Sequence, residues 1–335
     1  MTLRLDAAKK YGILLLIAIA CIFPHVVQRE YVVYVMTLGY IWSISVYGMN
    51  LLAGYTGQLS LAHAGFFAIG AYATGLLTVK AGLPFWPSLF LGCVITASIG
   101  FLVGLISLRT KEHYFAIFTL CVGFIMYLII ERWDDLTEGV RGLIGIPYPE
   151  PIGPLRFDTV TSQYYLVLFF LILTIFVMHR IVHSLVGRSF IAIRNSEELA
   201  QTIGIHLMKN KLLSFVISTF FAGLAGGLYA MFVRFLGPGI GHITVTFDML
   251  TYLLVGGIGS LAGPLIGTML VIWLTQSLQF LQDYRMIIFG PILVLIIIFM
   301  PYGIVGGLRT LWSKWSLRKK ALSWRPKNTE ESIRG

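Results

Sequence analysis

Charged residues are scarce in this sequence. Asp, Glu, Lys and Arg make up 12% of its 335 residues, whereas 57% are apolar. A soluble globular protein carries about a quarter of its residues as charged side chains. The shortage excludes a soluble domain and a disordered chain. The long uncharged runs between the remaining charges indicate an integral membrane protein that crosses the bilayer many times.

Cysteines are few and widely spaced. Cys21, Cys93 and Cys121 each stand alone in an apolar run, without CxxC or Cys/His spacing. This excludes a disulfide scaffold and a metal or redox site of ordinary spacing. We expect all three to be small buried apolar side chains. His179 and His183 lie four residues apart at a membrane boundary without a third ligand, so an interfacial role is favoured over metal binding.

Several catalytic and energy-coupling signatures are also missing. The sequence has no GxxxxGK[ST] phosphate-binding loop and no HExxH metal motif. No charged residue lies well inside an expected span, although Asp248 marks an edge, whereas ion-coupled carriers commonly hold such groups near the membrane centre. We therefore expect no enzyme activity and no cofactor on this chain. If it transports a solute, the energy comes from a separate subunit.

Apolar run lengths predict the membrane segments, since a helix needs about 20 residues to cross the hydrocarbon core. The runs predict spans at about 11–27, 32–52, 59–79, 85–107, 114–130, 163–182, 212–233 and 286–306. The uncharged stretch 249–282 is interrupted by glycines and Pro264, and neither half holds a full regular helix plus a turn. The sequence therefore predicts an all-α integral membrane protein with about ten transmembrane segments, some of them short or broken.

The basic residues orient these spans. With the N-terminus in the cytoplasm, 18 of the 25 Lys and Arg fall on four inner segments, 1–10, 108–113, 180–211 and 307–335. This is the positive-inside pattern, and it holds only if 249–282 crosses twice. The basic residues flank spans and do not line one face, so nucleic acid is not an expected partner. We expect one membrane domain, 1–335, with a core at 11–306 and a basic cytoplasmic tail at 307–335.

Two short motifs echo each other in the two halves of the chain. Ser60-Leu-Ala-His-Ala-Gly65 and Ser260-Leu-Ala-Gly263 each lie in a glycine-rich, uncharged interruption. Interrupted hydrophobic segments at corresponding places indicate broken helices around a transport path. Alternatively, small residues at GxxxG spacing pack helices together. His63 is interpreted either as a neutral packing side chain or as a substrate contact. The candidate pathway residues are Asn50, Tyr55, Thr56, Gln58, Ser60, His63, Thr119, Gly259 and Ser260.

The inner segment 184–211 is longer than the usual helix connection of about 2 to 8 residues. Ser196 followed by Glu197 and Glu198 predicts an N-capped helix, and Gly204 is a natural stop. Such a helix either lies on the lipid surface or docks a soluble partner.

The same loop carries a specific resemblance. Gly187-Arg-Ser-Phe-x-Ala-Ile-Arg-Asn-Ser-Glu-x-x-Ala-x-x-x-Gly-Ile, then Lys211-Leu-Leu-Ser-Phe-Val-Ile-Ser and Ala222-Gly-Leu-Ala-Gly-Gly, resembles the coupling loop and next helix of bacterial branched-chain amino acid ABC permeases. Three further stretches, starting at Gly54, Tyr114 and Gly256, are similar to the LivM-type subunit of that family. The matches run from about residue 37 to 305.

The resemblance implies an importer permease that forms half of a translocation path in the bacterial inner membrane, with both termini cytoplasmic. A homologous second permease, two cytoplasmic subunits that bind ATP and Mg, and an external solute-binding protein would complete it. Branched-chain amino acids are the implied substrates, while urea, short amides or small carboxylates remain alternatives, as does a channel or gradient-driven carrier. The implied ATPase-coupling residues are Arg188, Arg194, Asn195, Glu197, Glu198, Ala200 and Gly204.

One departure from the family pattern lies on the outer loop. Where the family usually shows Leu-Thr-Gly-Gly, this chain has Leu136-Thr-Glu-Gly139. Glu138 therefore places a carboxylate on the outer side of the membrane.

Overall fold

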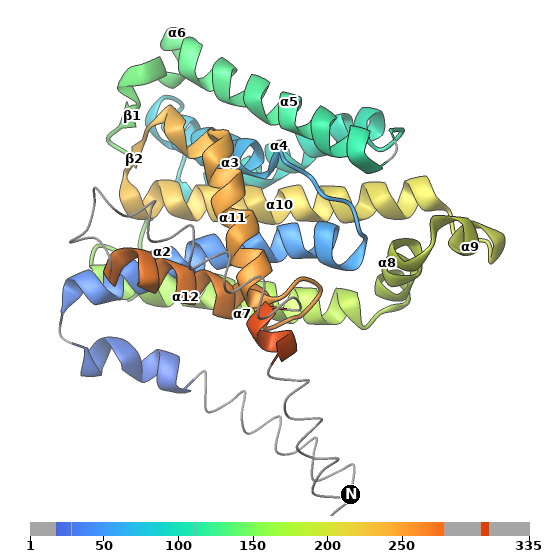
Figure 1. Ribbon diagram of the computed structural model, residues 1–335. Helices are drawn as coiled ribbons and strands as arrows, with labels where there is room; N and C mark the ends of the chain where they lie inside the picture. The colour runs from blue at the N-terminus through green and yellow to red at the C-terminus, as the bar shows by residue number, and fades with distance from the viewer. Residues whose placement is uncertain (1–17, 28, 111, 278–302, 308–335) are drawn as a thin grey trace, which may run out of the picture.

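The structure is a computed structural model that describes residues 18–27, 29–110, 112–277 and 303–307 (Figure 1). Within these residues the chain is a bundle of α-helices, which confirms the all-α membrane fold. The long elements are α2 (Glu30–Met49) with its π-helical extension η1 (Asn50–Tyr55), α3 (His63–Val79), α4 (Phe85–Ser107), α5 (Glu112–Arg132), α7 (Val160–Val182), α10 (Leu207–Val233), α11 (Ile243–Gly256) and α12 (Gly263–Ser277).

Shorter elements lie at the two ends of the bundle. One end carries α8 (Leu185–Asn195) and α9 (Glu197–Thr202), which project from the body of the bundle in Figure 1. The other end carries α6 (Asp134–Thr137), the 3₁₀ turns Gly139–Arg141 and Pro238–Gly241, and the strands β1 (Leu143–Ile144) and β2 (Phe235–Leu236), which pair antiparallel.

Helices α2 and α10 form the centre of the bundle. In α2 with its extension η1, and again in α10, 72% of the most apolar stretch of 18 residues is buried, against 28–33% in α4, α5 and α7. Small residues allow the close approach: a side chain at Gly100 of α4 would meet Thr219 of α10, and one at Gly104 would meet Phe215. The GxxxG spacing of α4 therefore serves helix packing, as one of the two alternatives predicted.

Five described helices are long and apolar enough to span a membrane: Glu30–Tyr55, Phe85–Ser107, His113–Arg132, Val160–Val182 and Leu207–Val233. The span predicted at 85–107 matches α4 at both ends. The stretch 249–282 contains the later part of α11, a break at 257–262 and the described part of α12. Residues 11–17 of the first predicted span, residues 286–302 of the last one and the tail from 308 to 335 lie outside the described residues, so the ten-segment count stays a prediction.

Three expectations were wrong in detail. The span at 59–79 is not one helix: residues 57–62 are non-helical and α3 begins at His63. Asp248 does not mark the edge of a helix but lies in the second turn of α11, which begins earlier than predicted. Cys21 and Cys121 are exposed on the bundle surface, and only Cys93 is buried. Apolar surface that faces lipid does not need to be covered by protein, so an apolar sequence context does not distinguish the two environments.

The loop after α5, which the charge pattern predicts to be outside and which we call the outer loop, was not foreseen as an ordered structure. The carboxylate of Glu150 accepts the backbone N–H of Phe85 at 2.9 Å and so satisfies the first turn of α4. Arg234, in the left-handed conformation at the end of α10, lies 4.1 Å from the ring centre of Tyr148 and donates from Nε to the carbonyl of Ile146. These contacts fasten the loop to the ends of α4 and α10.

Candidate functional site

The two echoing motifs occupy equivalent places in the structure. Ser60-Leu-Ala leads directly into α3, and Ser260-Leu-Ala leads directly into α12, each after a non-helical interruption. The Oγ of Ser260 accepts the N–H of Gly263 at 3.0 Å, whereas the Oγ of Ser60 accepts the N–H of Ala62 at 3.4 Å. The likeness in sequence therefore corresponds to a likeness in structure, which favours the repeat interpretation.

Asn50 joins the two interruptions. It begins the π-helical extension of α2 and is buried. Its Nδ2 donates to the carbonyl of Ser260 at 2.9 Å, and its Oδ1 accepts the N–H of Gly259 at 2.8 Å. π-helical turns frequently mark functional sites. One side-chain amide thus satisfies two backbone groups of a break that lies more than 200 positions later in the sequence.

The other candidate pathway residues are buried: Tyr55, Thr56, Gln58, Ser60, His63 and Thr119. His63 is 1% exposed, and its Nε2 lies 2.9 Å from the carbonyl of Ser45. Thr119 accepts the N–H of Leu61 at 3.0 Å. These contacts fix α3 to α2 and the segment 56–62 to α5, which favours the packing interpretation of His63. Of the predicted pathway residues, the structure brings Asn50, Gly259 and Ser260 into direct contact.

Two serine caps build the projecting helices α8 and α9. Ser184 Oγ accepts the N–H of Gly187 at 3.3 Å, and Ser196 Oγ accepts the N–H of Leu199 at 3.2 Å. The short helix predicted from Ser196 and the acidic residues after it is therefore confirmed. Three side chains anchor the pair on the bundle and are at most 2% exposed: Phe190, Ile193 and Ala200.

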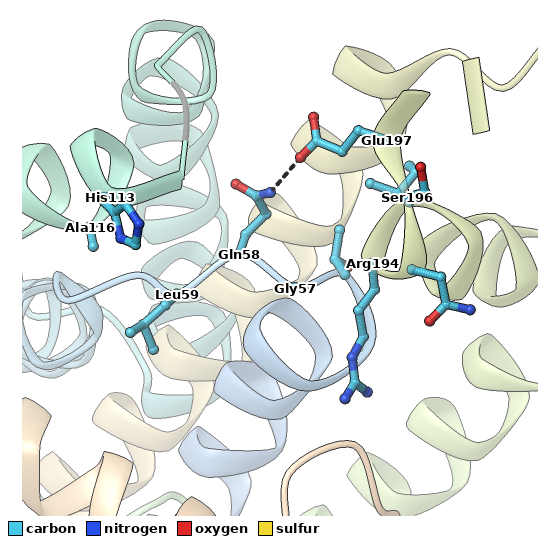
Figure 2. Close-up of a pocket in the computed structure, with 11 residues that line it drawn as sticks. Gly57, Gln58, Leu59, His113, Ala116, Arg194, Ser196 and Glu197 are labelled. Carbon is cyan, nitrogen blue, oxygen red and sulfur yellow. Dashed lines mark hydrogen bonds between the residues drawn. The ribbon is translucent and has the colours of Figure 1, made fainter. Parts of the chain in front are cut away.

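A cavity of about 390 Å³ lies where the end of α8 and the start of α9 meet the segment after η1 and the start of α5 (Figure 2). It is lined by Thr56, Gly57, Gln58, Leu59, His113, Ala116, Ile193, Arg194, Asn195, Ser196 and Glu197. Acidic, basic and amide groups therefore meet in one hollow between the loop and the membrane helices.

Glu197 connects three elements at this cavity. Its Oε1 lies 2.6 Å from Nζ of Lys211 on α10 and accepts a hydrogen bond from Nε2 of Gln58 at 3.4 Å, drawn in Figure 2. The side chain of Lys211 is 9% exposed and that of Glu197 40%. An ammonium group is costly to bury without a partner, so this ion pair fixes the start of α9 against α10.

Arg194 reaches in a different direction. In Figure 2 its side chain points away from the contact between Gln58 and Glu197. Its Nη1 donates a hydrogen bond to the carbonyl of Gly54, in the π-helical extension of α2. The loop is thus tied to the membrane helices at two separate points, Lys211 and Gly54.

The predicted coupling residues fall into two groups. Arg188, Asn195, Glu198 and Gly204 are exposed on the surface of the loop. The charged groups of Arg194 and Glu197 instead contact this chain, and Ala200 is buried beneath α9. Sequence reasoning missed Lys211 and His113. The closeness of Lys211 to the acidic start of α9, one loop apart, was an available signal for the ion pair.

Metal-ligand clusters of three or more His, Cys, Asp or Glu side chains are absent from the part of the chain that the structure describes. The rings of His179 and His183 stack with centroids 4.2 Å apart, and Nδ1 of His183 lies 2.8 Å from the carbonyl of His179.

Glu138 forms an ion pair on the outer loop. Its Oε1 lies 2.8 Å from Nζ of Lys80 at the end of α3. The hydrogen bond from Lys80 and its positive charge hold the pKa of the Glu138 carboxyl below its usual value. Glu138 also has a φ of +63°, a left-handed conformation that glycine adopts without strain. The backbone here therefore has the form that the family's glycine would favour, and the carboxylate is matched by a neighbouring cation.

Comparisons with known proteins agree with the membrane architecture. The chain is 31% identical over 320 residues to the high-affinity branched-chain amino acid transport system permease protein LivM of Salmonella typhimurium, covering 89% of this chain and 75% of that protein. It is 26% identical over 300 residues to the permease protein LivH of Escherichia coli, covering 81% and 93%. A probable LivM of Methanocaldococcus jannaschii is 23% identical, covering 65% and 68%.

No solved structure matched the chain. The sequence pattern of one family, described as the permease component of branched-chain amino acid transport systems, matches residues 31–297. This range includes η1, both interruptions and the α8–α9 loop. The chain is therefore a multi-pass membrane protein that belongs to the family of branched-chain amino acid transport permeases.

Proposed function

We propose that this chain is the transmembrane permease subunit of an ATP-driven importer for branched-chain amino acids. In this proposal it pairs with a homologous second permease, and the two chains form the translocation path. The chain itself is no enzyme: two separate subunits bind ATP and Mg and hydrolyse the nucleotide. An external solute-binding protein delivers the substrate. The location is the bacterial inner membrane, with both termini and the α8–α9 loop on the cytoplasmic side.

The arrangement of the α8–α9 loop carries this proposal. The loop projects from one end of the bundle (Figure 1) and presents large apolar side chains to its surroundings. Leu185 is 74% exposed, Leu199 68% and Ile203 72%. Inward-facing groups of the same loop contact the segments that interrupt the helices. A surface suited to a soluble partner is thus joined directly to the candidate path.

The exposed polar residues complete the proposed docking surface. Arg188, Asn195 and Glu198 are exposed on the same two helices as the apolar side chains. Apolar residues with a polar rim are typical of protein interfaces. Exposed charge pairs contribute only about 0 to 1 kcal/mol each, so the apolar side chains supply most of the docking free energy.

Reconstitution tests the proposal. The chain is purified with its candidate second permease and ATP-binding subunits, inserted into liposomes, and assayed for uptake of radiolabelled leucine. Uptake should require ATP and the loaded binding protein, and should stop when the phosphate-binding lysine of the ATPase subunits is replaced. Uptake that persists without nucleotide would show a channel or a gradient-driven carrier instead.

Competition in the same assay tests the substrate. The polar groups near the interruptions are neutral, namely Asn50, Tyr55, Thr56, Gln58, Ser60 and Thr119. Unlabelled isoleucine and valine should compete with leucine, whereas urea, acetamide and propionate should not. Competition by urea or acetamide alone would identify an amide permease of the same family.

A further inference from the structure

The side chain of Arg194 contacts both helix interruptions at once, where the first is taken to include the end of η1 (residues 54–62) and the second is 257–262. Its Nη1 donates to the carbonyl of Gly54 in the extension of α2. The same nitrogen lies 2.7 Å from the point where a side chain on Gly259 would begin, so it packs against the backbone of the second interruption. A single side chain of α8 therefore bridges two segments about 200 residues apart in sequence.

Glycines make this approach possible. The stem of Arg194 passes Gly57, whose missing Cβ would lie 3.2 Å from Cγ of the arginine. Gly57 and Gly259 have φ angles of +80° and +73°, a conformation that other residues adopt only with strain. At Gly54, a Cβ would lie 2.7 Å from the backbone nitrogen of Gly259. The two interruptions thus touch through their backbones, and Arg194 lies at the point of contact.

The chemistry of the contact suits a positively charged donor. Carbonyl groups in the last turn of a helix lack intrahelical donors and carry the negative end of the helix dipole. A guanidinium group offers several donors in one plane, and a charged donor forms a stronger hydrogen bond than a neutral one. Arg194 therefore stabilises the end of η1 more than a neutral amide in the same place would.

The two ties between the loop and the bundle differ in what they hold. Glu197 binds Lys211 on α10, a continuous and largely buried helix, and accepts a hydrogen bond from Gln58 in the first interruption. Arg194 binds Gly54 and packs against Gly57 and Gly259, so of these two side chains it is the one that touches both interruptions. A displacement of α8 therefore acts on the contact between the interruptions through Arg194, while Glu197 keeps α9 on the bundle.

We propose that Arg194 is the positioning residue through which α8 controls the contact between the two helix interruptions, and that movement of α8 releases Gly54 from Gly259. The inference rests on the proposed function, because a partner ATPase would supply the movement. Two measurements distinguish whether Arg194 holds the contact between the interruptions from whether that contact couples the permease to ATP hydrolysis.

The first measurement uses hydrogen–deuterium exchange on the full chain in lipid nanodiscs. Arg194→Gln removes the charge and shortens the side chain by two bonds, so its amide no longer reaches the carbonyl of Gly54. The amides of 257–262 and of 54–58 should exchange about tenfold faster than in the wild type, because a hydrogen bond to a charged group stabilises by about one tenfold step in an equilibrium. The matched control is Lys209→Gln, which removes an exposed cation from the first turn of α10; exchange should stay within about twofold.

The second measurement uses the assembled complex. The ratio of ATP hydrolysis with and without the substrate-loaded binding protein should fall about tenfold in Arg194→Gln and less than twofold in Lys209→Gln. A purely structural defect would reduce assembly, which co-purification reports, without changing this ratio. If the loaded binding protein did not stimulate ATP hydrolysis by the wild-type complex, both the proposed function and the coupling role would be overturned. The hydrogen–deuterium exchange measurement would still decide whether Arg194 holds the two interruptions together.

Two results would overturn the inference. Unchanged exchange at both interruptions in Arg194→Gln would show that the arginine does not hold them. Faster exchange with an unchanged stimulation ratio in an active complex would show that the contact is not used for coupling.

Discussion

Asn50 makes two hydrogen bonds to the backbone around Ser260: it donates to the carbonyl of Ser260 and accepts the N–H of Gly259. The amide is the side chain that suits this place, because it is uncharged and carries both a donor and an acceptor. A carboxylate lacks the donor, and an aliphatic side chain lacks both.

Replacement of Asn50 should therefore have graded effects. Asn50→Asp keeps the acceptor for Gly259, whereas Asn50→Leu leaves both half-buried backbone groups without their partner. A buried unpaired group costs about 1–3 kcal/mol and a half-buried one less, so thermal unfolding in detergent should show Asn50→Leu as the less stable variant. If the aspartate of Asn50→Asp ionised in this buried place, Asn50→Asp would be the less stable of the two variants. Unfolding followed by fluorescence at pH 6 and pH 8 would reveal such an ionisation.

The ion pair of Glu197 and Lys211 should respond unequally to removal of its two members. Glu197→Gln leaves the buried ammonium group without its charged partner and should destabilise α9 by about 1–3 kcal/mol, below the cost for a fully buried pair because the glutamate is 40% exposed. Lys211→Met leaves a carboxylate that solvent can reach, and should cost less. Hydrogen exchange of 197–203 measures both. Equal losses would mean that solvent screens the pair.

The proposed docking surface should depend on its apolar side chains. Leu199→Asp and Ile203→Asp should abolish co-purification with the ATP-binding subunits, while the chain still inserts into membranes. Ile152→Asp is the control, since Ile152 is 52% exposed in the outer loop at the opposite end of the bundle. Retained assembly in both loop variants would favour α9 as a helix on the lipid surface.

Substitutions at Ala200 and Gly204 test the packing of α9 and the backbone conformation of the turn after it. Ala200 is 1% exposed, so Ala200→Leu overpacks the base of α9 and should cost about 1–3 kcal/mol. Gly204 has open space around it but a φ of +84°, so Gly204→Ala strains the backbone by about 1 kcal/mol without a steric clash. Thermal unfolding should therefore rank Ala200→Leu as the more destabilised variant. The opposite order would mean that α9 repacks freely.

The pair of Glu138 and Lys80 should give the outer loop a pH dependence. Because the folded state lowers the pKa of Glu138, the pair stabilises the loop above the usual glutamate pKa of about 4.3 and is lost as pH falls through the lower folded-state value. The unfolding midpoint of the wild type should exceed that of Glu138→Gln at pH 7, and the difference should shrink as the pH falls below the usual glutamate pKa of about 4.3. A constant difference across this range would assign the effect to the backbone.

Most of the architecture was predictable from apolar run length, because each long helix has to cover the same hydrocarbon thickness. The span at 85–107 matches α4 at both ends for this reason. The start of α3 at His63 was predicted a few residues too early because the residues before it are uncharged and contain no proline. The contacts of Leu61 with Thr119 and of Gln58 with Glu197 show what holds this non-helical stretch.

The candidate site was predictable in its members but not in its contacts. Residue types marked Asn50, Gly259 and Ser260 among the candidate pathway residues, since neutral polar and glycine residues interrupt apolar runs there. The polar residues of the loop were expected to face a partner, yet Arg194 and Glu197 bind this chain. A charge on a short amphipathic helix can point either way, and only the position of Gly54 and Lys211 in space decides the direction.

Helix α10 connects the two ends of the bundle. Its 27 residues span about 40 Å at 1.5 Å per residue. Lys211 near its first turn binds the start of α9, and the strand that follows its last turn pairs with the outer loop at Leu143. A tilt of about 5° around one end of a helix of this length displaces the other end by about 3.5 Å. One unbroken helix therefore joins the α8–α9 loop to the loop at the opposite end of the bundle, and a tilt of α10 would shift one relative to the other.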